Sequence, residues 1–401
     1  MPGPLHGIRV IDLTQMVSGP LGAMILADQG ADVIKVEPPN GGDNTRQVAT
    51  RRGGFSASFL NNNRNKRSIV LNLKHSDGIA ALKRLIAGAD VVMQNFRPGV
   101  VDRLGVGYDA ARALKRDIVY ASITGFGETG PFSAKPVFDP LIQSLSGLTT
   151  VQAGSDQRRP SLIRTILPDK LTGFTIAQAI SAALFARERT GVGQHIQLSM
   201  LDAVIAFLWS SDMGGHTFVG DEAEAETAQS FIDLIYETKD GHISVAAFRR
   251  ADWVKLAEAC ERPEWVEDPR FVTSEGLEVN KPARLELTQD ALRTRTSAEW
   301  IERLEAHDVP CAPVLSRREM ITHPQVVENG IVTVTEHPQA GRLRQARPPA
   351  RFSETATEHR HGGQHLGEET RVVLAEAGFG ETEVDALIAS GAAAEPAGGS
   401  T

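Results

Sequence analysis

Asp169 is the residue of this chain whose type and position best suit covalent chemistry. It lies in the segment Pro168–Gly173, at the head of an apolar, Ala-rich stretch with helical spacing that closes at Arg189–Gly191. Amides at a helix start favour a carboxylate anion, so an aspartate there can be an N-cap or an activated nucleophile. Capping is by far the commoner use, and only residues elsewhere in the chain can favour the second. The two roles use the same location and are compatible.

Composition narrows the class of protein. The 401-residue chain is 41% apolar and 23% charged, which predicts a soluble globular protein of two or more domains. Its net charge of -8 argues against binding to nucleic acid or an anionic membrane, although the cluster Arg64, Lys66 and Arg67 suits a small anion. The two cysteines, Cys260 and Cys311, exclude a disulfide framework and a cysteine-based zinc site. We find neither a signal peptide nor an apolar run of about 18 residues, and therefore expect a cytoplasmic protein.

Two sequence patterns resemble a metal site and a dinucleotide site, and each lacks the residue spacing that such a site requires. His359, His361 and His365 lie in a polar loop without the i, i+4 spacing of a zinc helix, so we expect no metal. Glu37 ends the second expected strand, about 24 residues after the first expected strand ends. Dinucleotide-binding enzymes carry an acidic residue at about this spacing. The preceding turn, Ser18–Ala23, lacks the G-x-G-x-x-G pattern, so we expect no nicotinamide cofactor.

The N-terminal half alternates strands and helices, which predicts a mostly parallel, doubly wound α/β sheet. Helices are expected from Ser18 to about Gln29, over Gly78–Ala87, and behind Asp169. The loop Gly125–Pro131 follows a strand, at the sheet edge where ligands usually bind. The expected strands are Ile8–Leu13, Asp32–Glu37, Ser68–Leu73, Asp90–Met93, Asp117–Ile123 and His195–Met200.

The sequence changes character after Trp209, which predicts a second, smaller α+β domain. We place the large domain at residues 1–213, completed by 331–401, a linker at 214–230 and the small domain at 231–330. The segments Phe231–Thr238 and His242–Phe248 flank an Asp-Gly turn and predict a hairpin. The helices expected beyond it are Ala251–Cys260, Pro282–Arg293, Ser297–His307, Glu369–Ala377 and Thr382–Ser390.

Several motifs, in order and spacing, resemble class III CoA-transferases, the formyl-CoA and carnitine type whose relatives include α-methylacyl-CoA racemases. The resemblance runs in detail from about Leu5 to Met213 and more loosely to Ala389. The motifs that carry it are Asn61–Ile69, Asn95–Val100, Arg103–Gly105, Gly125–Gly127, Phe138–Asp139, Pro168–Gly173 and Arg189–Gln194.

The resemblance implies an interlocked homodimer in which each chain has a large Rossmann-like domain and a small domain. It implies that Asp169 is the nucleophile, that Asp139 is a second active-site residue, and that acyl-CoA and carboxylic acids are substrates with no tightly bound cofactor. The positions implied to contact CoA are Val17, Ser18, Leu71, Asn72, Leu73, Lys74, Asn95, Phe96, Arg97, Arg103, Lys135 and Phe138.

The sequence also departs from this family. The formyl-CoA enzymes carry Gln where Val17 stands and Arg where Pro38 stands, and His242–Phe248 replaces their run of glycines, which argues against formate or oxalate as substrate. The racemases carry a His where this chain has Phe138, and a phenyl ring cannot move a proton. CoA transfer through Asp169 is therefore the leading hypothesis. An acyl-CoA racemase and a non-catalytic CoA-binding protein are the alternatives.

Overall fold

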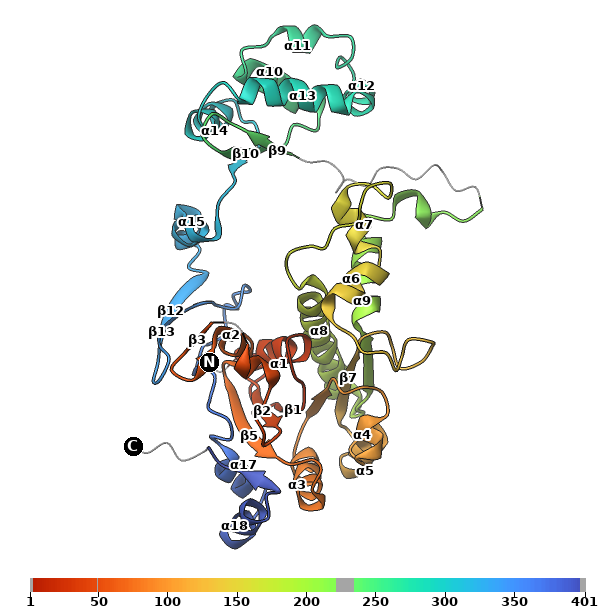
Figure 1. The fold of residues 1–401 in the computed structure, drawn as a ribbon, viewed down its shortest axis with the longest axis vertical. Helices are drawn as coiled ribbons and strands as arrows, with labels where there is room; N and C mark the ends of the chain where they lie inside the picture. Colours follow the sequence, from red (N-terminus) through yellow and green to blue (C-terminus); the bar gives the residue numbers. More distant parts are fainter. Residues whose placement is uncertain (1–2, 49, 221–233, 397–401) are drawn as a thin grey trace. The chain divides into compact units, whose positions relative to one another are not determined.

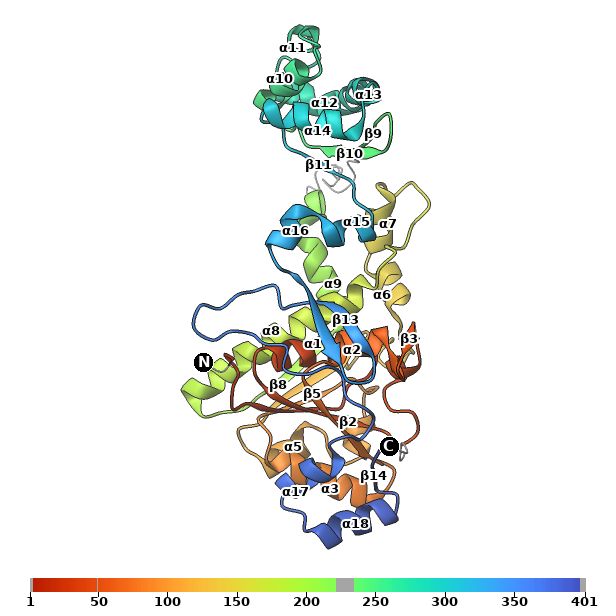
Figure 2. The same ribbon diagram turned by 90° about the vertical axis from the view of Figure 1, so that its left-hand side faces the viewer.

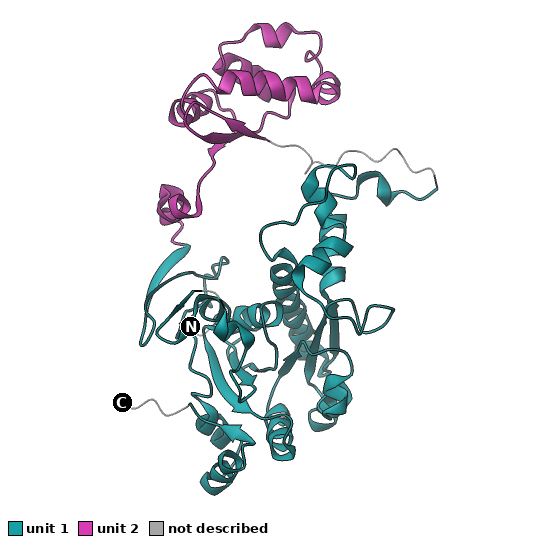
Figure 3. Cartoon of the chain, in the orientation of Figure 1, with its two compact units in different colours: residues 1–229, 331–401 teal, residues 230–330 magenta. Residues whose placement is uncertain are grey.

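The computed structural model describes residues 3–48, 50–220 and 234–396. The chain forms two compact units, one of residues 1–229 and 331–401 and the other of residues 230–330 (Figure 3). The expected linker 214–230 lies partly outside the described residues, and its first part contains the short 3-10 helix η2 (Gly214–Thr217). Within the described residues, no helix is both long enough and apolar enough to span a bilayer.

Unit 1 is built on a seven-stranded sheet in the order β14-β5-β2-β1-β6-β7-β8 (Figure 1). The six strands β5, β2, β1, β6, β7 and β8 run parallel to one another. The seventh strand, β14, pairs antiparallel with β5 at the edge of the sheet. The direction of winding therefore reverses between β1 and β6, which confirms the expected doubly wound arrangement. The strands are β1 (Arg9–Asp12), β2 (Asp32–Glu37), β5 (Lys66–Leu71), β6 (Val91–Gln94), β7 (Val119–Thr124), β8 (His195–Ser199) and β14 (Ala393–Ala394).

Both faces of the sheet are covered by helices, so its central strands are apolar on both sides. Figure 2 shows α1 (Ser18–Asp28) and α8 (Leu167–Thr190) on one face, and α3 (Ser76–Ala87), α17 (Thr370–Glu376) and α18 (Glu381–Ala389) on the other. Val10 of β1 packs toward α1 and α8, whereas the next residue, Ile11, packs toward α3. The C-terminal helices α17 and α18 thus complete the layer that begins more than 280 residues earlier.

Two glycines allow α1 and α8 to lie unusually close. A Cβ atom on Gly22 would lie 2.5 Å from the Cγ2 atom of Ile176, and one on Gly173 would lie 2.9 Å from the carbonyl oxygen of Ser18. Any side chain at either position would push the helices apart. The close packing brings the first turns of both helices together, with Ser18 beside the start of α8.

The remaining elements of unit 1 surround this sheet. They include a C-terminal hairpin of β12 (Val332–His337) and β13 (Gly341–Ala346), where strand character was expected. The others are η1 (Asn44–Gln47), β3 (Arg51–Arg52), β4 (Phe55–Ser56), α2 (Ala57–Asn63), α4 (Val100–Arg103), α5 (Tyr108–Leu114), α6 (Asp139–Leu145), α7 (Leu148–Ala153) and α9 (Met200–Trp209).

Unit 2 packs helices on a three-stranded antiparallel sheet, β11-β10-β9. The expected hairpin is present as β9 (Ile235–Glu237) and β10 (His242–Val245), and Trp253, Phe271 and Trp300 are buried in the core. His242–Val245 is thus the central strand of this sheet. The other elements are β11 (Cys311–Pro313), α10 (Arg250–Ala259), α11 (Glu264–Glu267), α12 (Ser274–Val279), α13 (Lys281–Leu292), α14 (Ser297–Ala306), α15 (Arg317–Thr322) and α16 (Pro324–Glu328).

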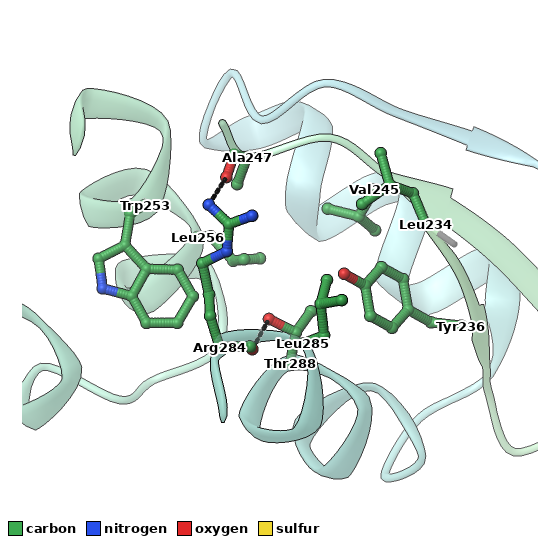
Figure 4. Close-up of a pocket in the computed structure, with 9 residues that line it drawn as sticks. All are labelled: Leu234, Tyr236, Val245, Ala247, Trp253, Leu256, Arg284, Leu285 and Thr288. Atoms are coloured by element: carbon green, nitrogen blue, oxygen red, sulfur yellow. Dashed lines mark hydrogen bonds between the residues drawn. The ribbon is translucent and has the colours of Figure 1, made fainter. Parts of the chain in front are cut away.

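A small cavity lies inside unit 2 (Figure 4). It is lined by Tyr236, Trp253 and Arg284, among others, and the Arg284 guanidinium donates to the backbone oxygen of Ala247 over 3.3 Å. Its volume of about 10 Å³ has room for roughly one water molecule and for no substrate. The cavity is a packing feature of this core.

Candidate functional site

Asp169 lies in the first turn of α8, but it does not cap the helix. The N-cap position is Ile166, Pro168 occupies the first turn, and the cap makes no side-chain hydrogen bond. The reading of Asp169 as an N-cap is therefore wrong. The helix begins earlier because a proline in the first turn loses no helical hydrogen bond. The Asp169 carboxylate instead accepts hydrogen bonds from the backbone N–H and the hydroxyl of Ser18, the first residue of α1.

The environment of Asp169 disfavours its charge without abolishing it. Burial, and then the nearby carboxylate of Asp139, raise the pKa of Asp169 to about 6, while the hydrogen bonds from Ser18 act in the opposite direction. Asp169 forms no ion pair with any residue that the structure describes. At pH 7 the carboxylate is still mostly ionised, and it is more basic than an ordinary aspartate.

Asp139 contacts the start of α8 through a buried chain of hydrogen bonds. It is the first residue of α6, and its Oδ2 atom accepts from the backbone N–H of Asp169 over 3.2 Å. Its Oδ1 atom accepts from Nε2 of Gln143 over 2.6 Å, and Oε1 of Gln143 accepts from the backbone N–H of Ile163 over 2.9 Å. Sequence reasoning missed Gln143, although the i, i+4 spacing from Asp139 is a signal for such a pair.

The turn between β1 and α1 is fixed by side chains from β2 and from the segments that follow β2 and β6. Oδ1 of Asn95 accepts from the backbone N–H of Gln15 over 2.9 Å, and Nδ2 of Asn95 donates to the carbonyl of Gln15 over 2.8 Å. The Lys35 ammonium donates to the carbonyl of Thr14 over 2.8 Å, and Oδ1 of Asp43 accepts from the N–H of Met16 over 3.2 Å. The turn leads directly to Val17 and Ser18.

Charged residues beneath this turn form a buried cluster that sequence reasoning also missed. Lys66 contacts Asp12 at 2.9 Å, and Lys35 contacts Asp43 at 2.9 Å. Burial alone would raise the pKa of Asp12, but Lys66 and Lys35 hold it below its ordinary value. The available signal was a lysine between the apolar residues Ile34 and Val36 of an expected central strand, since buried charges are almost always paired.

Glu37 is fully engaged within the protein. Its carboxylate accepts two hydrogen bonds of 2.7 Å from Arg46 and one of 2.7 Å from the hydroxyl of Ser68. The same carboxylate also accepts from the backbone N–H of Asp43 over 2.9 Å. It is therefore not free to bind a ribose hydroxyl, in keeping with the missing dinucleotide fingerprint.

The segments expected to contact CoA all follow carboxyl ends of parallel strands. Leu71–Lys74 ends β5, Val17 and Ser18 follow β1, Asn95–Arg97 follows β6, and Lys135 and Phe138 lie in the loop after β7. One edge of the sheet therefore gathers them, around the point where the winding reverses and ligands usually bind. Within this set, Asn95 and Asn72 are already used inside the protein, because Asn72 donates to the carbonyl of Gly391 over 3.3 Å.

Four cations remain exposed at this edge. Lys74, Arg97, Arg103 and Lys135 are exposed, and Lys135 stacks on the ring of Phe132 with its Nζ atom 3.2 Å from the ring centre. Arg97 and Arg103 form no ion pair with the described part of the chain. A polar hollow of about 350 Å³ opens beside Phe96 and Arg97 on the sheet. Of these four cations only Arg97 lines the hollow, and the carboxylates of Asp102, Asp109 and Glu128 line it as well. Exposed cations at this edge of the sheet suit the phosphate groups of a ligand.

Known proteins resemble this chain over nearly its whole length. Succinyl-CoA:glutarate CoA-transferase of Homo sapiens is 30% identical over 380 residues, covering 93% of this chain and 86% of its own. Acetyl-CoA:oxalate CoA-transferase of Acetobacter aceti is 34% identical over 336 residues, covering 82% and 85%. The crystal structure of a CAIB/BAIF family protein from Brucella suis superposes with a TM-score of 0.82 at 29% identity, covering 94% of this chain and all of that one.

The family assignment rests on the extent of these matches. Residues 5–370 match the family model for CoA-transferase family III, which covers all of unit 2, the strands β1 to β8 and the segment that carries Asp169. The chain therefore belongs to CoA-transferase family III.

Proposed function

We propose that this enzyme moves CoA between an acyl-CoA and a carboxylic acid through covalent intermediates on Asp169. The observation that carries the proposal is the position of this carboxylate. It is mostly ionised at neutral pH, has no cationic partner in the described residues, and faces two neutral donors of Ser18 at the ligand-binding edge of the sheet.

The proposed reaction balances without metal or ATP. The Asp169 carboxylate attacks the thioester carbonyl, the carbon–sulfur bond breaks, and a mixed anhydride and CoA thiolate result. The thiolate then attacks the aspartyl carbonyl, which releases the first carboxylate and leaves an aspartyl-CoA thioester. The acceptor carboxylate attacks this thioester to give a second anhydride and thiolate. Attack of that thiolate on the acceptor's acyl carbon forms the new acyl-CoA and restores Asp169.

Ser18 suits two stages of this sequence. Its N–H and hydroxyl first orient the Asp169 carboxylate, and Ser18 begins an 11-residue helix whose dipole favours negative charge. When thiolate or carboxylate attacks the aspartyl carbon, negative charge develops on the Asp169 oxygen that these donors already contact. Preset donors of this kind typically contribute a factor of about 100–1,000 to a rate.

The exposed cations suit CoA, and the assembly is proposed from the family resemblance. We assign Lys74, Arg97, Arg103 and Lys135 to the CoA phosphates, with Val17, Leu73, Phe96 and Phe138 against its less polar parts. Leu71 is buried in the core of unit 1 and is left out of this assignment. Asp139 positions the start of α8 through its bond to the N–H of Asp169. The active form is proposed to be an interlocked homodimer in the cytoplasm.

The racemase alternative is disfavoured at Phe138. This residue caps α6 with 67% of its surface exposed and carries no group that can transfer a proton. Relatives that match more than four fifths of this chain are named CoA-transferases. A racemase must exchange the α-proton with solvent, so 2-methylacyl-CoA incubated with the protein in deuterated water should gain no α-deuterium.

The decisive experiment traps the covalent intermediate. A panel of acyl-CoA donors is incubated with the enzyme and hydroxylamine, and peptides are analysed by mass spectrometry. The expected product with a true donor is a hydroxamate on Asp169, with loss of activity. Asp169→Ala should fold, lose all transfer and form no adduct. Transfer by that variant near the wild-type rate, or rapid deuterium wash-in without any adduct, would overturn the proposal.

A further inference from the structure

The turn that precedes Ser18 has an unusual backbone conformation. Met16 has a φ of 72°, a left-handed value that residues other than Gly, Asn and Asp seldom adopt. Such a conformation persists only where its surroundings fix it, and it is found most often at functional sites. Met16 lies two residues before the amide and hydroxyl that contact Asp169.

Three side chains hold this turn at successive residues. Lys35 binds the carbonyl of Thr14, Asn95 binds both the N–H and the carbonyl of Gln15, and Asp43 binds the N–H of Met16, at 2.8–3.2 Å. The three residues come from β2, from the segment after β6, and from the segment after β2. Held in this way, the turn has little freedom to relax.

The supporting charges are themselves immobilised. Lys35 and Asp43 are almost wholly buried and lie 2.9 Å apart, and Lys66 donates to the carbonyl of Pro20 in the first turn of α1 over 2.8 Å. Asp12, bound by Lys66, accepts from the N–H of Thr14 over 2.9 Å. The cluster therefore binds the turn on one side and the start of α1 on the other.

We propose that Asn95, Asp43 and Lys35 are positioning residues that hold the Thr14–Met16 turn so that the N–H and hydroxyl of Ser18 point at the Asp169 carboxylate. Their catalytic consequence rests on the proposed function, but their structural effect does not. The family resemblance places Asn95 among CoA contacts. Both ends of its side-chain amide bind Gln15, so the amide holds the turn, and only its second N–H and second lone pair are left for a ligand.

The charge state of Asp169 reports on this arrangement. The groups that face its carboxylate are Asp139 from α6 and the neutral donors of Ser18 from α1, while the adjacent Lys170 is bound to the hydroxyl of Thr165 over 2.7 Å. Loss of the Ser18 donors removes what lowers the pKa of Asp169 and leaves the burial and the carboxylate that raise it. Releasing the turn should therefore make Asp169 harder to ionise.

The test measures protonation of Asp169 in Asn95→Ala, independently of turnover. A carbodiimide with an amine nucleophile modifies protonated carboxyl groups, and the modified fraction at Asp169 is followed by mass spectrometry across pH. The wild-type midpoint should lie near pH 6, and that of Asn95→Ala at higher pH. If CoA transfer is established, kcat should fall about 100-fold, as for the loss of an oxyanion donor.

Met16→Gly supplies a rescue. Glycine adopts left-handed φ values without strain, so Met16→Gly alone should leave kcat and the midpoint nearly unchanged. Combined with Asn95→Ala, it should recover several-fold of the lost kcat and return part of the midpoint shift. Failure of the double variant to recover either quantity would contradict a role through the turn.

Asn65→Ala is the matched control. Asn65 is buried, whereas Asn95 is half-buried. The Oδ1 atom of Asn65 accepts from the N–H groups of Arg360 and His361 over 2.7 and 3.0 Å, and its backbone is left-handed. It should lose stability at least as strongly as Asn95→Ala, without moving the Asp169 midpoint. Equal midpoint shifts in both variants, an unchanged midpoint in Asn95→Ala, or a raised KM for acyl-CoA with unchanged kcat would each overturn the proposal. A shifted midpoint in a protein without transferase activity would support the turn's role and refute the proposed function.

Discussion

Asp169 is both ionised at neutral pH and unusually basic, two properties that oppose each other in most carboxylates. A carboxylate beside an arginine or lysine is easily ionised, but its electron pairs are already bound and it is a weak base. Here the charge is opposed by burial and by Asp139, and only the neutral donors of Ser18 stabilise it. The carboxylate therefore remains available for attack, and its raised pKa indicates higher basicity. Holding an ionised carboxylate in these surroundings lowers the unfolding free energy of the protein.

The first prediction concerns that free energy. Because folding raises the pKa of Asp169 from 3.8 to about 6, ionisation of this carboxyl lowers the unfolding free energy by up to about 3 kcal/mol. The stability that the protonated carboxyl provides is therefore fully present below pH 4 and is lost as pH rises through 6. Asp169→Asn keeps the shape and cannot ionise, so we expect it to be more stable than wild type by about 1–3 kcal/mol at pH 8.

Urea unfolding of both proteins at several pH values checks this prediction. The difference in unfolding free energy should shrink as pH falls through 6 and approach zero near pH 4. A variant that is equally or less stable than wild type at pH 8 would show that Asp169 is not destabilised by its surroundings.

The second prediction concerns the pH dependence of activity. Only the ionised carboxylate can attack, so kcat/KM should fall about tenfold per pH unit below about pH 6. Ser18→Ala removes the hydroxyl donor and keeps the backbone N–H, so this acid limb should move to higher pH. Ser133→Ala, a change in an exposed turn, should leave the limb in place. Identical profiles in Ser18→Ala and wild type would remove Ser18 from the mechanism.

At the scale of elements, the site depends on how closely α1 and α8 pack. Asp169 and Ser18 belong to different helices, separated by about 150 residues of chain, and they meet because Gly22 and Gly173 leave no side chain between the helices. Glycine usually weakens a helix by about 1 kcal/mol relative to alanine. At these two positions the lost propensity is offset by close packing.

The third prediction follows from this packing. Gly22→Ala improves helix propensity but places a methyl group 2.5 Å from Ile176, so we expect a net loss of about 1–2 kcal/mol in unfolding free energy. Because the shifted helices separate Ser18 from Asp169, kcat should fall as well. Gly88→Ala, where the nearest atom would lie 3.7 Å away, is the control and should change neither quantity appreciably. Normal stability and activity in Gly22→Ala would contradict the role of the close approach.

Much of this element structure is predictable from the sequence. Segments rich in Val and Ile, such as Asp32–Glu37 and Asp117–Ile123, predict strands that the structure confirms to within about two residues, because strands in the middle of a parallel sheet are rich in β-branched residues. The hairpin around Lys239–Gly241 is likewise confirmed, since Asp-Gly suits a tight turn.

The parts that local patterns missed depend on contacts between distant segments. Lys35 and Asp43 are ordinary charged residues in sequence, and their burial beneath α1 emerges only when the sheet is wound. Local spacing allows Asp169 to be the N-cap because it stands at the head of the helical stretch, whereas Leu167 and Pro168 begin the helix. Neither the left-handed Met16 nor the pair of hydrogen bonds between Asn95 and Gln15 has a signature in local spacing.

At the scale of the molecule, unit 1 exposes large apolar side chains on several neighbouring helices. Large apolar side chains are exposed along α8 and α9, among them Phe174, Phe185 and Trp209, each with half or more of its surface accessible. Phe138 and Leu141 add to them on α6. Exposed apolar residues gathered on neighbouring helices usually mark a surface that is buried in an assembly.

The last prediction tests the proposed interlocked homodimer. If two chains pass through each other, they cannot separate while folded, so sedimentation should show a dimer even at nanomolar concentration. Chains carrying two different labels, mixed as folded proteins, should not exchange over days, because exchange requires unfolding. After both are unfolded in urea and refolded together, about half of the dimers should carry both labels. An ordinary dimer, held only by its apolar surface, would exchange without denaturant at a rate set by dissociation. Exchange in native buffer, or a folded monomer on dilution, would therefore exclude the interlocked assembly while leaving the chemistry at Asp169 open to its own tests.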